Sequence, residues 1–307
     1  MTTRIRLGLC CQFLDAPIRF RTATHKYVHT LEPPARRAYL ASIARDNAQA
    51  LFDAAERCEA LGIGAFRINS QILPLTTHPT SGYRLEDLDD DGSITESFRV
   101  AGERARAADV RLSFHPDQFV VLNSEQERVV LSSVGEMHAQ GDIAALVGAD
   151  VLTLHGGGAA GGIPAALERL ERGIERLSPE ARVRLALEND DRSFTPEVLL
   201  PLCERLGVPL VYDVHHHRCN PDSLDVSEAT ARAVQSWGAR EPYFHISSPR
   251  NGWTGDSRPH ADYIELDDFP EAWRDLRVTI DVEAKAKERA VLALRDALIA
   301  AASAVEG

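Results

Sequence analysis

Short apolar runs that end in a histidine or a carboxylate recur along the chain. Runs of this form occupy residues 111–115, 151–155, 184–188, 210–213, 243–245 and 278–283. The segments between them carry apolar residues at helical spacing, as in 36–61, where Gly62 provides a C-terminal stop. Strands that are buried on both faces have continuous apolar runs of this kind. The pattern therefore predicts parallel strands alternating with helices.

Over the whole chain, this alternation of apolar runs and helical segments predicts eight strands and at least seven helices. The strands are expected at 5–10, 65–68, 111–115, 151–155, 183–188, 209–214, 242–246 and 277–283. Helices are expected at 36–61, 95–108, 126–146, 163–177, 226–237 and 285–302, with one more beginning at the cap Thr195 and Pro196. Eight strands, most of them followed by a helix, favour a single (β/α)8 TIM barrel over residues 1–307. No GxGxxG follows the first strand, which argues against a dinucleotide-binding sheet.

Composition narrows the class of protein further. A chain of 307 residues that is 44% hydrophobic can bury the core of one such barrel. No apolar stretch approaches the roughly 20 residues that cross a bilayer, so no membrane partner is expected. The start of the chain lacks a secretory apolar region, and its five cysteines, an odd number without framework spacing, favour a reduced, cytoplasmic protein.

The net charge of −12 argues against a nonspecific polyanion binder. Two features weaken that argument. Divalent metals would offset a carboxylate cluster locally, and Asp87, Asp89, Asp90 and Asp91 fall in one expected surface loop. Charge alone therefore leaves the partner open.

The polar residues at the strand ends have the chemistry of a metal site. Glu188, Asp213 and Glu283 supply carboxylates, and the imidazoles come from His115, His155, His216 and His245. Imidazole nitrogen favours transition metals over calcium. A single strand-end histidine is more often structural, but a whole rim of such groups would be costly to bury without cations. At most two of the three histidines at 215–217 can face inward, and the sequence leaves open which of them is a ligand.

Basic residues gather at two further places. The loop after the first strand is crowded with cations and imidazoles, namely Arg19, Arg21, His25, Lys26, His29, Arg36 and Arg37. Lys285 and Lys287 follow Glu283 closely. Each group is either a solvated surface or, if it lies on the metal rim, a positive surface for a phosphate backbone.

Eight motifs in order along the chain resemble the UV damage endonucleases, which are single-domain TIM-barrel repair nucleases related in architecture to endonuclease IV and to sugar isomerases. The motifs lie at 66–70 with Pro74 and His78, and at 114–119, 154–157, 187–190, 212–217, 245–248, 260–263 and 281–288. They cover nearly the whole chain. The most specific are Asp-Val-His-His-His at 213–217 and Asp-Val-Glu-Ala-Lys-Ala-Lys-Glu at 281–288.

The resemblance implies a metal-assisted endonuclease that cuts damaged double-stranded DNA immediately 5′ of a lesion such as a pyrimidine dimer or a 6-4 photoproduct. The catalytic, metal-binding residues fall on Glu188, Asp213, His245 and Glu283. His115, His155, His216 and His78 would complete a cluster of two to three Mn²⁺ ions, with Zn²⁺ or Mg²⁺ as the alternatives. Gln118 and Phe119 match the pair that probes the opened duplex. We take the remaining DNA contacts to be Arg19, Arg21, Lys26, His260, Lys285 and Lys287 on a monomeric protein.

The chain departs from the family pattern at two positions. Tyr243 stands where the pattern can carry a modified lysine that bridges metals, and Leu9 stands where an aromatic residue is expected after the glycine of the first strand. The first departure bears on the third metal and the second on one contact with the lesion. Neither touches the carboxylates.

Three other functions are compatible with parts of the pattern. A sugar isomerase or epimerase on the same barrel also uses Glu, Asp and His with a divalent metal, and an apurinic-site endonuclease shares the nuclease chemistry. A non-catalytic metal-binding or damage-recognition protein is the third. The basic first loop and Asp117-Gln118-Phe119 favour DNA over a sugar, and the complete set of carboxylates favours an active enzyme.

Overall fold

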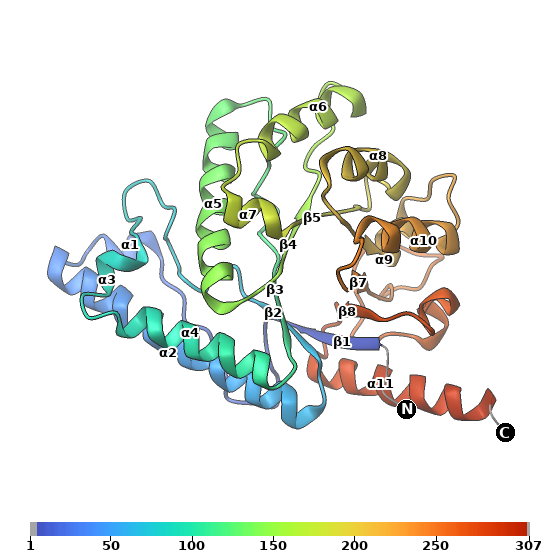
Figure 1. Ribbon diagram of the computed structural model, residues 1–307, viewed down its shortest axis with the longest axis horizontal. Helices are drawn as coiled ribbons and strands as arrows, with labels where there is room; N and C mark the ends of the chain where they lie inside the picture. Colours follow the sequence, from blue (N-terminus) through green and yellow to red (C-terminus); the bar gives the residue numbers. More distant parts are fainter. Residues whose placement is uncertain (1–4, 306–307) are drawn as a thin grey trace.

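A closed barrel of eight parallel strands forms the centre of the protein, as the sequence predicts. The computed structural model describes residues 5–305. The strands pair in chain order, and β8 returns to β1 to close the barrel (Figure 1). They are β1 (Ile5–Cys10), β2 (Ala65–Ile68), β3 (Arg111–Phe114), β4 (Val151–His155), β5 (Leu185–Glu188), β6 (Leu210–Asp213), β7 (Tyr243–Ile246) and β8 (Val278–Val282).

Helices follow most of the strands and cover the outside of the barrel (Figure 1). They are α1 (His25–Val28), α2 (Pro33–Leu61), α3 (Leu85–Leu88), α4 (Ser93–Ala107), α5 (Glu127–Val147), α6 (Ile163–Ile174), α7 (Pro179–Arg184), α8 (Pro196–Leu206), α9 (Val214–Cys219), α10 (Val226–Ser236) and α11 (Glu288–Val305). Two short 3-10 turns, η1 (Leu266–Asp268) and η2 (Glu271–Trp273), precede β8. None of the helices in the described chain is both long and apolar enough to cross a membrane.

The structure corrects three of the predicted element boundaries. The helix expected over 163–177 ends at Ile174, and Ser178 caps a second helix, α7, whose last turn takes residues that were assigned to the fifth strand. The final helix begins at Glu288 rather than at 285, because Lys287 has a left-handed backbone (φ 52°). The short helix α9, which begins directly after β6, was not predicted. Its cap is Asp213, whose side chain accepts a hydrogen bond from the backbone N–H of His216.

Side chains along each strand point alternately into the barrel and outward against the helices. The apolar core therefore consists of two clusters. In β5, Leu185 and Leu187 belong to the large apolar core, whereas Ala186 belongs to a small separate cluster. Glu188 lies two residues further along, on the same side of the strand as Ala186. Strand register then brings polar residues level with one another, with His155 beside Glu188 in the β4–β5 pair. Asp213 likewise pairs with His245 between β6 and β7.

Two helical glycines provide a test of the packing of α4 against α5. A Cβ added to Gly102 in α4 would lie 2.2 Å from the carbonyl oxygen of Val147, whereas a Cβ at Gly135 in α5 would meet nothing within 4 Å. Gly102→Ala is therefore expected to lower the free energy of unfolding by about 1–3 kcal/mol through overpacking. Gly135→Ala should raise it by up to about 1 kcal/mol through helix propensity. Urea unfolding followed by circular dichroism measures both, and equal effects of the two variants would contradict the packing described.

Candidate metal centre and nucleic-acid interface

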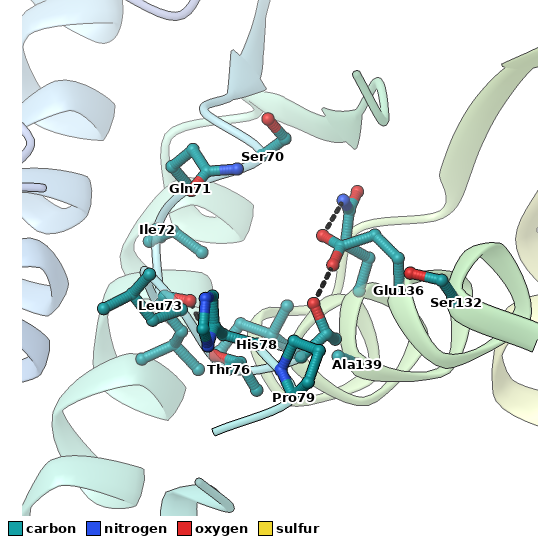
Figure 2. A pocket seen from close by; sticks show the side chains of 14 residues that line it. Ser70, Gln71, Ile72, Leu73, Thr76, His78, Pro79, Ser132, Glu136 and Ala139 are labelled. Atoms are coloured by element: carbon teal, nitrogen blue, oxygen red, sulfur yellow. Dashed lines mark hydrogen bonds between the residues drawn. The ribbon is translucent and has the colours of Figure 1, made fainter. Parts of the chain in front are cut away.

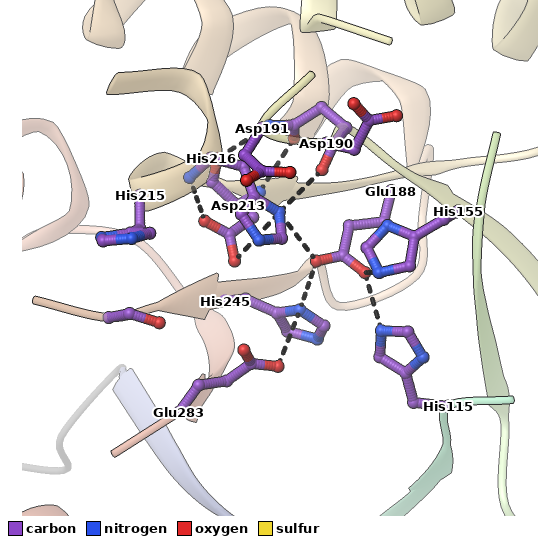
Figure 3. Close-up of polar contacts among 12 residues, drawn as sticks. His115, His155, Glu188, Asp190, Asp191, Asp213, His215, His216, His245 and Glu283 are labelled. Carbon is purple, nitrogen blue, oxygen red and sulfur yellow. Dashed lines mark hydrogen bonds and ion pairs between the residues drawn. The ribbon is translucent and has the colours of Figure 1, made fainter. Parts of the chain in front are cut away.

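The carboxylate of Glu188 is the centre of the site, and four histidines surround it (Figure 3). Its Oε2 lies 2.8 Å from Nε2 of His115 and 3.4 Å from Nε2 of His155. Its Oε1 lies 2.9 Å from Nδ1 of His245 and 3.5 Å from Nδ1 of His216. These residues come from the carboxyl ends of β3 to β7, so the barrel brings together groups that are far apart in the sequence.

Asp213 and His216 form the second part of the site, and the geometry distinguishes among the three consecutive histidines. Nδ1 of His216 lies 3.6 Å from Oδ2 of Asp213, and it contacts the backbone carbonyl of Asn189 at 3.0 Å, which orients the ring. His217 instead bonds Tyr212 and Asp222, and His215 contacts the carbonyl of Arg258. His216 is therefore the histidine of this run that lies in the cluster.

Glu283 borders the cluster on the β8 side, where Arg67 holds it. Nη1 of Arg67 donates to Oε1 of Glu283 at 2.7 Å, and Nε of Arg67 lies 3.5 Å from Asp281. Oε1 of Glu283 is also 3.5 Å from Nδ1 of His245, and Oε2 is 3.6 Å from Nδ1 of His260. His260, expected from the sequence as a DNA contact, is thus placed against a predicted metal ligand. The sequence reasoning did not single out Arg67, although this residue belongs to the 66–70 motif.

The two positions that depart from the family pattern are both buried. The hydroxyl of Tyr243 donates to Oδ1 of Asp281 at 2.8 Å and contacts the Ser113 hydroxyl at 2.7 Å. Tyr243 therefore packs below the cluster as part of a polar network. Leu9 is completely buried in the core.

The charges in the cluster depend strongly on one another. Burial alone would raise the pKa of Glu188, but the imidazoles of His155, His245 and His115 hold that pKa well below its usual range. Burial opposes protonation of His216 and His245, yet nearby carboxylates, chiefly Asp213 for His216 and Glu188 for His245, raise both pKa values to about 9. Without a metal, protons on His216 and His245 therefore balance the buried carboxylates. A divalent cation can replace these protons, because metal binding to histidine releases them.

The donor set fits divalent metal ions. Two groups of donor atoms each lie within 4.8 Å of one another, namely His115 with His155 and Glu188, and Glu188 with Asp213 and His216. Several buried polar atoms in the cluster have no hydrogen-bond partner among residues 5–305, including Nδ1 of His155, Oδ2 of Asp213 and Nε2 of His245. Unsatisfied buried donors and acceptors are costly, and a bound cation with its waters would satisfy the acceptors. Mixed imidazole and carboxylate donors suit manganese or zinc.

An open cleft of about 450 Å³ lies against the cluster and carries the predicted lesion probe. Its walls include His115, His155 and Glu283 as well as Gln118 and Phe119. Phe119 is 79% exposed, which is unusual for a large apolar side chain. An exposed aromatic ring beside a metal cluster is available to contact a substrate.

The basic residues that are predicted to contact DNA differ in whether they already have partners within the protein. Arg19 donates to backbone carbonyls within its own loop, including that of Ala16, and Arg21 pairs with Asp46 in α2. Arg19 therefore stabilises the loop itself, and Arg21 ties the loop to α2. Lys26 and Lys285 are exposed, and Lys287 is half-buried.

His78 lies outside both groups of donor atoms. It lines a separate cavity of about 260 Å³ together with Gln71, Thr76 and Glu136 (Figure 2). Its ring stacks on His25 at a centroid distance of 4.2 Å. Its Nδ1 accepts hydrogen bonds from the backbone N–H groups of Thr80 and Ser81. In this conformation the histidine organises its own loop, and the structure does not bring it to the cluster.

A family model described as UV-endonuclease UvdE matches residues 5–305. The chain belongs to this family. The UV DNA damage endonuclease of Deinococcus radiodurans is 37% identical over an alignment of 308 positions that covers 94% of each protein. The crystal structure of SacUVDE superposes with a TM-score of 0.84 at 26% identity, covering 96% of this chain and 98% of that one.

The UvdE match confirms the resemblance seen in the sequence and places the chain among endonucleases that act on UV-damaged DNA. Endonuclease IV from Thermus thermophilus shares the fold, with a TM-score of 0.63 at 18% identity over 96% of this chain and 98% of that one. The TIM-barrel fold predicted from the strand pattern is thereby confirmed.

Proposed function

We propose that this UvdE-family chain nicks double-stranded DNA immediately 5′ of UV photoproducts by metal-assisted hydrolysis, with two to three Mn²⁺ ions as cofactor. The observation that carries the proposal is the Glu188 carboxylate surrounded by four imidazoles, beside a cleft with an exposed Phe119. Cyclobutane pyrimidine dimers and 6-4 photoproducts are the proposed lesions. The protein would act as a monomer.

The residues of the cluster have separate roles in this proposal. Glu188 would be shared by both groups of ligands, with His115 and His155 on one side and Asp213 and His216 on the other. His245, Glu283 and His260 would hold a third ion, and Arg67 would orient the carboxylate of Glu283. Divalent ions bound there would lower the pKa of water and stabilise charge on the phosphate oxygens.

Lesion preference follows from the cleft rather than from the cluster. A damaged base is easier to unstack, so distortion of the duplex costs less free energy at a lesion than elsewhere. Gln118 and Phe119 line the cleft beside His115 and would occupy the space left in the stack. Exposed Lys26 and Lys285 would contact the backbone.

An incision assay tests the proposal. The substrates are one duplex with a single thymine dimer, one with an apurinic site and one undamaged, each with added manganese and again after chelation. We expect a single cut 5′ of the dimer that chelation abolishes and manganese restores. Cutting of the apurinic duplex alone would favour an apurinic-site endonuclease, and no cutting of any duplex would contradict the proposal.

Gln118→Ala is expected to weaken binding of the dimer duplex about tenfold, with a smaller effect on the rate of cutting at saturation. The physical reason is that Gln118 lies in the cleft wall and contacts no carboxylate of the cluster. Fluorescence anisotropy with labelled duplexes measures the affinity, and single-turnover nicking measures the rate. Gln126→Ala, at the exposed cap of α5, is the matched control. A loss of rate without a loss of affinity would contradict the role of Gln118 as a probe.

A further inference from the structure

Trp253 is an exposed aromatic side chain whose position the structure fixes. Its indole is 40% exposed, whereas Trp237 and Trp273 are buried. Nε1 of Trp253 donates to Oδ1 of Asp268 at 2.8 Å. The guanidinium of Arg218 lies 5.6 Å from the centre of the Trp253 ring. A buried carboxylate and a cation thus hold this ring in place, and its exposed face is preorganised to stack on a ligand.

The loop that carries Trp253 is closed at its base. Residues 249–260 follow β7, and Pro249 forms an antiparallel bridge with His260. The backbone N–H of Arg250 donates to the carbonyl of Pro259, and Ala261 N–H donates to Ser248, both at 2.8 Å. The loop therefore presents Trp253 from a defined hairpin-like base on the rim of the barrel.

A chain of ring contacts connects Trp253 to the metal cluster. The ring centroids of Trp253 and His215 are 5.4 Å apart, and those of His215 and His260 are 5.2 Å apart. Nδ1 of His260 is in turn 3.6 Å from Oε2 of Glu283. Trp253 thus lies on the same face as the cluster, two aromatic contacts away from it.

Phe119 and Trp253 lie on opposite sides of the cluster. Phe119 follows β3 and Trp253 follows β7, and these strands are four positions apart in either direction around the closed barrel. Between them, His115 and His245 contact the two oxygens of the Glu188 carboxylate, at 2.8 and 2.9 Å. A duplex with its backbone on the cluster would therefore have an exposed aromatic ring on each side.

We infer that Trp253 is a second DNA-stacking residue, which packs against a base of the lesion-containing duplex across the cluster from Phe119. This inference rests on the proposed function and adds a contact to it. Nucleic acid fits the surface because every base offers a flat face for an indole. Exposed Arg250, which has no ion pair within residues 5–305, stands at the base of the same loop and adds a positive charge for the backbone.

Intrinsic fluorescence tests the contact without any substitution. The chain has three tryptophans, and only Trp253 is exposed, so acrylamide should quench Trp253 selectively. We expect a saturating dimer duplex, with a phosphorothioate at the linkage to be cut, to lower the quenching constant severalfold. Trp253→Phe assigns the signal, because it should remove the quenchable emission. An unchanged quenching constant in the presence of duplex would overturn the inference, as would protection that instead grows with protein concentration in the absence of DNA, which indicates a second copy of the chain.

Measuring both duplex affinity and nicking shows whether a negative result contradicts the role of Trp253 or the proposed function. Trp253→Ala should weaken binding of the dimer duplex about tenfold, and Trp253→Phe should retain most of the affinity. Ile299→Ala, at a half-exposed apolar residue on α11, should change nothing. If the wild-type chain nicks the dimer duplex and Trp253→Ala binds it normally, only the inference is wrong. If the wild-type chain does not nick, the proposed function fails, and the role of Trp253 fails with it.

Discussion

Glu188→Gln is expected to reduce nicking of a dimer duplex by more than about a thousandfold, the upper range for loss of one electrostatic contact at a reacting centre. Glu188 is the residue shared by both groups of donor atoms, so its replacement disturbs both at once. The variant should also bind fewer metal ions, since an amide does not carry the charge that balances two cations. Single-turnover nicking with excess enzyme measures the rate.

The control for Glu188→Gln is Glu168→Gln. Glu168 lies on α6, is highly exposed and pairs only loosely with Arg172, at 3.9 Å. The same chemical change there should leave nicking within twofold of the wild-type rate. Nicking by Glu188→Gln at a comparable rate would contradict the central role of this carboxylate.

Glu283→Gln is expected to abolish detectable nicking for a different reason. Its carboxylate lies between Arg67 and His260 and approaches His245 at 3.5 Å. The amide would leave Arg67 with Asp281 as its remaining anionic partner. The buried cation would then be poorly compensated, and any ion held near His245 would lose a ligand. Stopped-flow or quench-flow nicking assays measure the rate.

Glu283→Gln should leave Glu188 with its histidines, so metal binding should be reduced rather than lost. Isothermal titration calorimetry with manganese measures how many ions the variant binds, and so distinguishes an ion held by Glu188 from one held near His245. Thermal unfolding checks that the variant folds. Normal nicking by this variant would contradict the proposed role of Glu283 in the reaction.

The barrel and much of the cluster could be predicted from the sequence because both depend on local pattern. Successive side chains of a strand point to opposite faces, so the sequence alone indicates which residues share a face with His155 or Glu188. The carboxyl ends of the parallel strands of a barrel meet on one rim. The sequence therefore indicated most of the residues that surround Glu188. The family match and the closed sheet confirm the fold on which that reasoning depended.

The features that the residue pattern left open or did not predict depend largely on partners distant in the sequence. Which of the consecutive histidines enters the cluster is decided by α9 and by the backbone carbonyl of Asn189. The ion pair between Arg21 and Asp46, 25 residues further along the chain, was not predicted. The sequence predicts Arg67 only as part of a strand, because its partner Glu283 lies 216 residues further along the chain. Spacing within a segment carries no information about such contacts.

Anomalous diffraction from crystals grown with manganese shows whether the cluster around Glu188 binds cations. We expect two to three peaks within bonding distance of the cluster, with one of the ions contacting Glu188 and His115 and another contacting Glu188 and Asp213. Glu188→Gln crystals should lose or weaken these peaks. Crystals of an actively nicking preparation with no peak near Glu188 would contradict the claim that these carboxylates and imidazoles share cations.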